Sequence, residues 1–72
     1  MIKAGQYYRH FKGNLYYVIE IATHTETGEK MVVYRDTNYD QKVWVRPFEM
    51  FEEKVMNAEG ELVPRFAFHS DK

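Results

Sequence analysis

Short runs of alternating apolar and polar residues, separated by turn-forming residues, make up most of this chain. The longest run covers residues 15–24, where Leu15, Tyr17, Ile19 and Ile21 fall on one face of an extended strand. The other face carries Tyr16, Val18, Glu20, Ala22 and His24. Because both faces are partly apolar, this run predicts a central strand.

Shorter runs on both sides predict further strands at residues 6–11, 31–35, 42–46, 52–56 and 62–68. Gly13 and Gly28 lie in the connections, where positive φ allows a tight reversal, and residues 36–40 form the most loop-like stretch. Pro47 ends the run before it because it has no N–H to donate. Phe48 and Phe51 have the spacing of one helical or 3₁₀ turn.

This order of elements predicts an all-β fold, a small antiparallel SH3-like barrel of five to six strands with one short helical turn near residues 47–51. Pro64 marks the strand at 62–68 as an edge strand. An OB-like barrel normally needs a longer chain and a helix. The SH3-like barrel is therefore preferred.

With 72 residues the chain has room for one domain, expected to span residues 1–72 with an ordered body at about 5–68. Six Tyr, five Phe and one Trp supply buried area that the short length would otherwise lack. Cysteine is absent, and no apolar run approaches the ~20 residues of a membrane span. We therefore expect a cytoplasmic protein with no membrane partner.

The net charge of −1 argues against general electrostatic binding to duplex DNA. The charge is unevenly divided, because residues 1–46 carry seven Lys and Arg against five Asp and Glu, whereas residues 47–72 carry three against six. Such a division of charge would orient a charged partner more than it would increase the overall attraction to that partner. Solvated surface charge without a partner is the simpler interpretation.

Several motifs spread along the chain resemble one family. They are Gly5-x-Tyr7-x-x-His10-x-Lys12-Gly13-Asn14, His24-Thr25-Glu26-Thr27, Val33-Tyr34-Arg35, Trp44-Val45-Arg46-Pro47 with Met50-Phe51, and Pro64-Arg65-Phe66. As a set they resemble the bacterial domain of unknown function 1653 family, over almost the whole chain. The resemblance implies a small bacterial domain of about this size, without implying an activity.

Planar cations next to aromatic rings are the pattern most suggestive of a ligand site. Arg46 and Trp44 share a face by alternation, and Arg35 ends a strand expected to pair nearby. Arginine can grip phosphate or carboxylate with two hydrogen bonds, and a ring can stack on a base. The candidate ligand-binding residues are Tyr7, His10, His24, Glu26, Tyr34, Arg35, Trp44, Arg46 and Arg65. Alternatively, Trp44 is a core residue and the arginines pair with the glutamates at 49, 52 and 53.

Few residues of this chain could support catalysis. The chain has no Cys, and its one Ser, Ser70, lies near the C-terminus, so a nucleophile is not expected. His24 and Glu26 could form an acid–base pair, although they could equally complete a hairpin turn. The histidines His10, His24 and His69 match no metal-ligand spacing, and no phosphate-binding loop is present. No metal or cofactor is expected.

Two kinds of function follow. The first is a noncatalytic binding module for a nucleotide, single-stranded nucleic acid, a peptide or another anionic planar ligand. The second is a small enzyme that uses His24 and Glu26. A third possibility is self-association through a strand edge near Pro64 or through Phe66 and Phe68, which would give a weak homodimer in place of a monomer.

Overall fold

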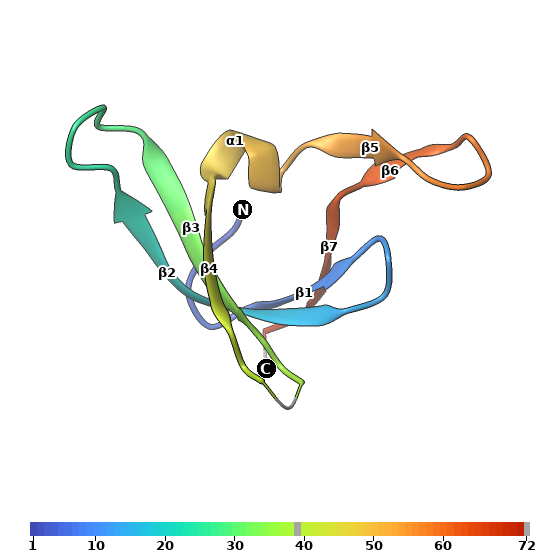
Figure 1. Ribbon diagram of the computed structural model, residues 1–72, viewed down its shortest axis with the longest axis horizontal. Coiled ribbons are helices and arrows are strands. Elements are labelled where there is room, and N and C mark those ends of the chain that lie inside the picture. Colours follow the sequence, from blue (N-terminus) through green and yellow to red (C-terminus); the bar gives the residue numbers. More distant parts are fainter. Residues whose placement is uncertain (39, 72) are drawn as a thin grey trace.

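The computed structural model describes residues 1–38 and 40–71, and within them the chain forms seven strands and one helical turn (Figure 1). In chain order these are β1 (Tyr7–His10), β2 (Leu15–Thr23), β3 (Lys30–Asp36), β4 (Val43–Pro47), α1 (Phe48–Phe51), β5 (Lys54–Met56), β6 (Leu62–Pro64) and β7 (Phe66–Ser70). The expected run at 62–68 is divided in two at Arg65, and Tyr39 of the expected loop lies outside the described residues. No helix in the described part is long and apolar enough to cross a membrane.

Five strands form one antiparallel sheet in the order β4-β3-β2-β1-β7, and β5 pairs with β6 in a separate two-stranded sheet. The first residues of β2 pair with β1 on one side and with β3 on the other, so β2 lies at the centre of the bent sheet (Figure 1). No strand pairing among the described residues joins β4 to β7. The prediction of an all-β, antiparallel fold is confirmed, whereas the sheet does not close into a barrel.

A β-bulge in β2 changes which side chains face the core. The register against β3 shifts between Val18 and Glu20, so that Val18 lies opposite Tyr34 and Ile21 lies opposite Val32. Directly opposed residues of an antiparallel pair project to the same face, so Val18 and Ile21 both face inward although they are three positions apart. The expectation that Ile21 shares the face of Leu15, Tyr17 and Ile19 is therefore wrong, because the extra residue reverses the alternation.

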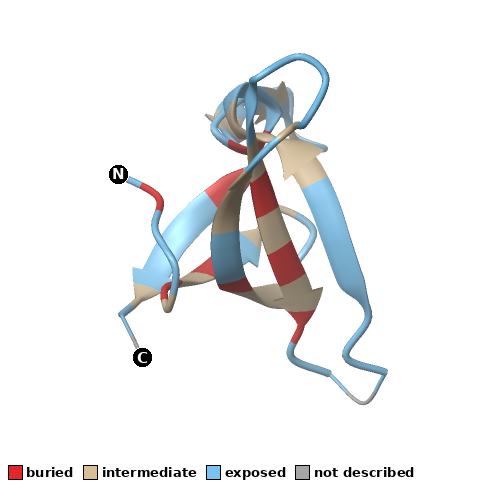
Figure 2. Ribbon diagram, turned by 90° about the vertical axis from the view of Figure 1, so that its left-hand side faces the viewer, coloured by how far each residue is buried: buried red, intermediate tan, exposed pale blue. Residues whose placement is uncertain are grey.

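The core lies against one face of the sheet, called the inner face below. Its buried side chains are Ile2, Tyr8, Val18, Val32, Tyr34, Phe51 and Phe66. Phe51 is the buried residue of α1, and its ring stacks on Phe66 with centroids 4.0 Å apart. Figure 2 shows the consequence for the sheet, in which β3 alternates between buried and half-buried residues while β4 beside it is exposed over most of its length.

Candidate functional site

The register of the sheet places three of the candidate ligand-binding residues together on the inner face. Tyr34 lies directly opposite Trp44, and Val32 lies opposite Arg46. Because Val32 is fully buried, Trp44 and Arg46 project to the side of the core. This agrees with the alternation expected along β4, since Val43 and Val45 project to the outer face.

Arg46 is held in place by aromatic residues. Its Nε donates to the hydroxyl oxygen of Tyr34 at 3.3 Å, and its guanidinium carbon lies 5.8 Å from the centre of the Phe66 ring. Within residues 1–38 and 40–71, no carboxylate lies within ion-pair distance of Arg46. The side chain is therefore oriented while its positive charge is not neutralised.

Arg65 lies in the segment between β6 and β7, directly before Phe66 in the chain. Its backbone N–H donates to the carbonyl of Glu53, and its own carbonyl accepts from the N–H of Phe11, both at 2.9 Å. Its Nη2 donates to Glu53 Oε1 at 2.8 Å, and its buried Nε has no hydrogen-bond partner among the residues that the structure describes. A buried donor without a partner is costly to the folded state.

His10 lies beside Phe66 and is affected by the charges of both arginines. Its ring lies 5.0 Å from that of Phe66, and its Nδ1 accepts the N–H of Lys12 at 3.2 Å. Burial lowers the pKa of His10 below its usual 6.5, and the charges of Arg65, Arg46 and Lys12 lower this pKa further. His10 and Arg46 thus both lie beside Phe66, and the charge of Arg65 acts on the same histidine; these three residues are called the cationic cluster below.

Trp44 adds an accessible aromatic surface. It is 45% exposed although its side chain projects to the inner face. A half-exposed indole next to oriented guanidinium groups can stack on a planar ligand while the cations hold an anion. We call the set His10, Tyr34, Trp44, Arg46 and Arg65 the cationic–aromatic surface.

Two of the candidates, Tyr7 and Arg35, lie on the opposite face of the sheet. Arg35 pairs with Tyr17 and Val43, and its guanidinium carbon lies 4.7 Å from the centre of the Tyr17 ring. Tyr7 pairs with Tyr17 as well, with ring centroids 5.0 Å apart. The structure therefore places Tyr7 and Arg35 beside the same residue, Tyr17, on the face of the sheet opposite Arg46.

His24 and Glu26 lie in the turn between β2 and β3, at the end of β2 far from His10. The Nδ1 of His24 accepts the backbone N–H of Glu26 at 3.1 Å and that of Thr27 at 3.4 Å. The contact between His24 and Glu26 thus uses the Glu26 backbone and stabilises the turn. In the described part of the chain, no group of three His, Cys, Asp or Glu side chains could hold a metal ion.

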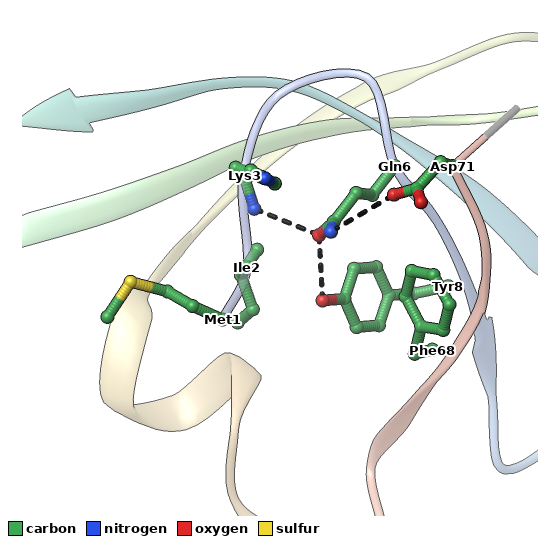
Figure 3. A pocket seen from close by; sticks show the side chains of 7 residues that line it. All are labelled: Met1, Ile2, Lys3, Gln6, Tyr8, Phe68 and Asp71. Carbon is green, nitrogen blue, oxygen red and sulfur yellow. Dashed lines mark hydrogen bonds between the residues drawn. The ribbon is translucent and has the colours of Figure 1, made fainter.

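No sequence pattern predicts the pocket beside the N-terminal segment (Figure 3). It has a volume of about 500 Å³ and is lined by Met1, Ile2, Lys3, Gln6, Tyr8, Phe68 and Asp71. The buried Gln6 organises its floor, since Gln6 Oε1 accepts the Tyr8 hydroxyl at 2.9 Å and the Lys3 N–H at 3.0 Å. Burial, followed by the charges of Glu52 and Asp71, raises the pKa of Tyr8.

Comparison with known proteins gives a family and a fold. Residues 6–68 match the family described as "Protein of unknown function (DUF1653)". The chain is similar to a crystal structure of a DUF1653 protein from Bordetella bronchiseptica, with 31% identity, a TM-score of 0.81, and coverage of 92% of this chain and 86% of that one. No curated protein matched the chain. Because the family match spans residues 6–68, this chain belongs to the DUF1653 family.

Proposed function

We propose that this protein is a noncatalytic binding domain of the bacterial cytoplasm that holds an anionic ligand on its cationic–aromatic surface. One observation supports this most directly. Arg46 lies over the ring of Phe66, which Arg65 precedes in the chain, yet of these two arginines Arg65 alone has a carboxylate partner among the described residues. A surface that served stability alone would gain little from keeping an unpaired guanidinium at the edge of an aromatic core.

Contacts within the protein orient both arginines before a ligand binds. The Tyr34 hydroxyl and the Phe66 ring restrict the side chain of Arg46, and backbone hydrogen bonds to Glu53 and Phe11 fix the position of Arg65. A guanidinium that is already oriented loses less entropy when it binds an anion. In this proposal the fold is an SH3-like barrel that stays open between β4 and β7, with the ligand at its open side.

The chemistry fits an oxyanion joined to a flat group. Phosphate and carboxylate both match the two-pronged geometry of a guanidinium, and a nucleobase, a ring or a peptide plane can lie against Trp44. A mononucleotide, single-stranded nucleic acid and an acidic peptide share this chemistry. With a net charge of −1, the protein gains little attraction at long range, so affinity depends on the local contacts.

Trp44 is the single tryptophan of the chain, so its fluorescence reports ligands at this surface directly. We expect titration with a mononucleotide, a single-stranded oligonucleotide or an acidic peptide to change the emission. Arg46→Gln should weaken binding by roughly tenfold or more, because a hydrogen bond to a charged group contributes about 1.5–3 kcal/mol.

Arg35→Gln provides the matched control, since Arg35 lies on the opposite face and should leave the affinity unchanged. Equal affinities for the wild type and Arg46→Gln, with both folded, would contradict the proposal. Equal losses in Arg46→Gln and Arg35→Gln would also contradict it, because they would indicate nonspecific attraction between charges.

A further inference from the structure

Three consecutive apolar residues are exposed on a strand that, within the described part of the chain, pairs on one side alone. Val43 and Val45 are each 61% exposed and Trp44 is 45% exposed. β4 is the terminal strand of the five-stranded sheet and pairs with β3 (Figure 2). An apolar edge of this kind promotes aggregation unless it has a partner or a protective feature.

The register identifies the backbone groups that are free to pair. The N–H of Asp36 donates to the carbonyl of Lys42 at 3.0 Å, so these two residues form a hydrogen-bonded pair. Hydrogen-bonded and non-hydrogen-bonded pairs alternate along an antiparallel ladder. The backbone groups of Trp44 and Arg46 therefore point toward β3, while the N–H and C=O groups of Val43 and Val45 point outward.

The side chains along β4 indicate the charge of the partner. Lys42, directly before β4, and Trp44 and Arg46 within it alternate along one face, and Arg46 has no carboxylate partner among the described residues. A second copy of the chain aligned with Trp44 opposite Trp44 would place Lys42 opposite Arg46, and like charges directly opposite each other destabilise a strand pair. Acidic residues at these positions would instead stabilise the pair.

We propose that β4 binds an extended acidic peptide as an added antiparallel strand. The peptide places acidic side chains opposite Lys42 and Arg46 and an apolar side chain opposite Trp44, which gives the pattern acidic-x-apolar-x-acidic. Its residues opposite Val43 and Val45 exchange backbone hydrogen bonds with them. The inference rests on the proposed function, because the carboxylate opposite Arg46 is the anion that the cationic cluster receives.

The first test uses a synthetic peptide in which Glu-Val-Leu-Val-Glu is flanked by Gly and Ser. We expect it to change Trp44 fluorescence and to slow hydrogen exchange at the Val43 and Val45 amides. The Glu-to-Gln version of the peptide should bind at least roughly tenfold more weakly. Binding that is unaffected by this change would overturn the inference.

The second test leaves the protein unaltered and changes the peptide backbone. N-methylation of the two peptide residues opposite Val43 and Val45 removes the donors that face β4, so we expect binding to be lost. N-methylation of the residues opposite Lys42 and Trp44 alters amides that point away from β4, and binding should persist. Equal effects of the two methylation patterns would exclude an added strand.

A protein variant provides a parallel test. Val45→Pro removes an outward N–H that β3 does not use, whereas Val45→Thr keeps it. With folding verified by NMR, Val45→Pro should lose the peptide and Val45→Thr should retain it. Retention in folded Val45→Pro would overturn the inference.

Other outcomes separate this inference from the proposed function. If oligonucleotides or mononucleotides bind through Arg46 while acidic peptides do not, the strand-addition inference fails and the proposed function stands. If no anionic ligand responds to Arg46→Gln, the proposed function fails. A concentration-dependent dimer in sedimentation that disappears in Val45→Pro would show that a second copy occupies the edge, which would overturn the choice of partner.

Discussion

His10 and Phe66 lie directly opposite each other on β1 and β7, with their ring centroids 5.0 Å apart and their planes inclined by 77°. Phe66 also stacks on Phe51 and lies beneath the guanidinium of Arg46. One ring thus belongs to both the core and the candidate site. Substitutions in the site must therefore be chosen so that Phe66 keeps its packing.

The first prediction concerns pH. Burial and the charges of Arg65, Arg46 and Lys12 lower the pKa of His10 below 6.5, so the unfolded chain binds this proton more readily than the folded protein. The stabilisation from neutral His10 is complete above about pH 6.5 and is lost as the pH falls through the lowered folded pKa. Urea denaturation at a series of pH values should show the unfolding free energy decreasing over this interval.

His10→Asn is the matched variant, because the Asn side-chain oxygen can accept the Lys12 N–H without titrating. The difference in unfolding free energy between wild type and His10→Asn should depend on pH below about 6.5 and be constant above it. A constant difference throughout would contradict the assignment to His10. A bound anion should in addition raise the pKa of His10 in an NMR titration.

The second prediction concerns the aromatic stack. Phe51→Ala leaves a cavity beside Phe66 and should lower the unfolding free energy by about 3–5 kcal/mol, a large part of the total for a small domain. Met50 lies on the same helical turn and is 43% exposed, so Met50→Ala should change it by less than about 0.5 kcal/mol. Urea denaturation measures both. Similar losses in the two variants would show that α1, and not the stack, carries the stability.

Local signals predicted most of the fold. The strands follow from alternation, and the turn at Gly28 follows from a residue that accepts its observed φ of 77°. No local sequence pattern predicts the bulge at Ile19. The bulge lets Val18 and Ile21 both face the core against β3. That requirement exists only once β2 and β3 are paired, so the sequence of β2 alone does not show it.

The site was predictable only where it lies within a single strand. Trp44 and Arg46 share a face because they are two positions apart on β4. Arg35 was expected beside them, yet its pairing with Val43 turns it to the outer face. The alternation of side chains along a strand does not predict the position of Arg65, because this residue lies between β6 and β7. Backbone hydrogen bonds to Glu53 and Phe11 position it instead.

The third prediction uses the carboxylate that competes with a ligand for Arg65. The ion pair of Arg65 with Glu53 is partly exposed, so Glu53→Gln should change the unfolding free energy by less than about 1 kcal/mol. The same change frees Arg65 and should raise the affinity for an anionic ligand, measured by Trp44 fluorescence, by roughly fivefold. Glu52→Gln removes an equal charge without touching Arg65 and serves as the control. An equal gain in both variants would indicate a general charge effect.

The last prediction decides between a structural and a chemical role for His24. Its Nδ1 accepts two backbone N–H groups, from Glu26 and Thr27, so His24→Ala should lower the unfolding free energy by about 1 kcal/mol. His24→Asn supplies an oxygen near the same position and should recover most of this loss. Glu26→Gln keeps the backbone N–H and should be neutral in stability and in ligand affinity. Retained stability in His24→Ala would contradict the turn role, because both N–H groups would then have lost their acceptor without consequence.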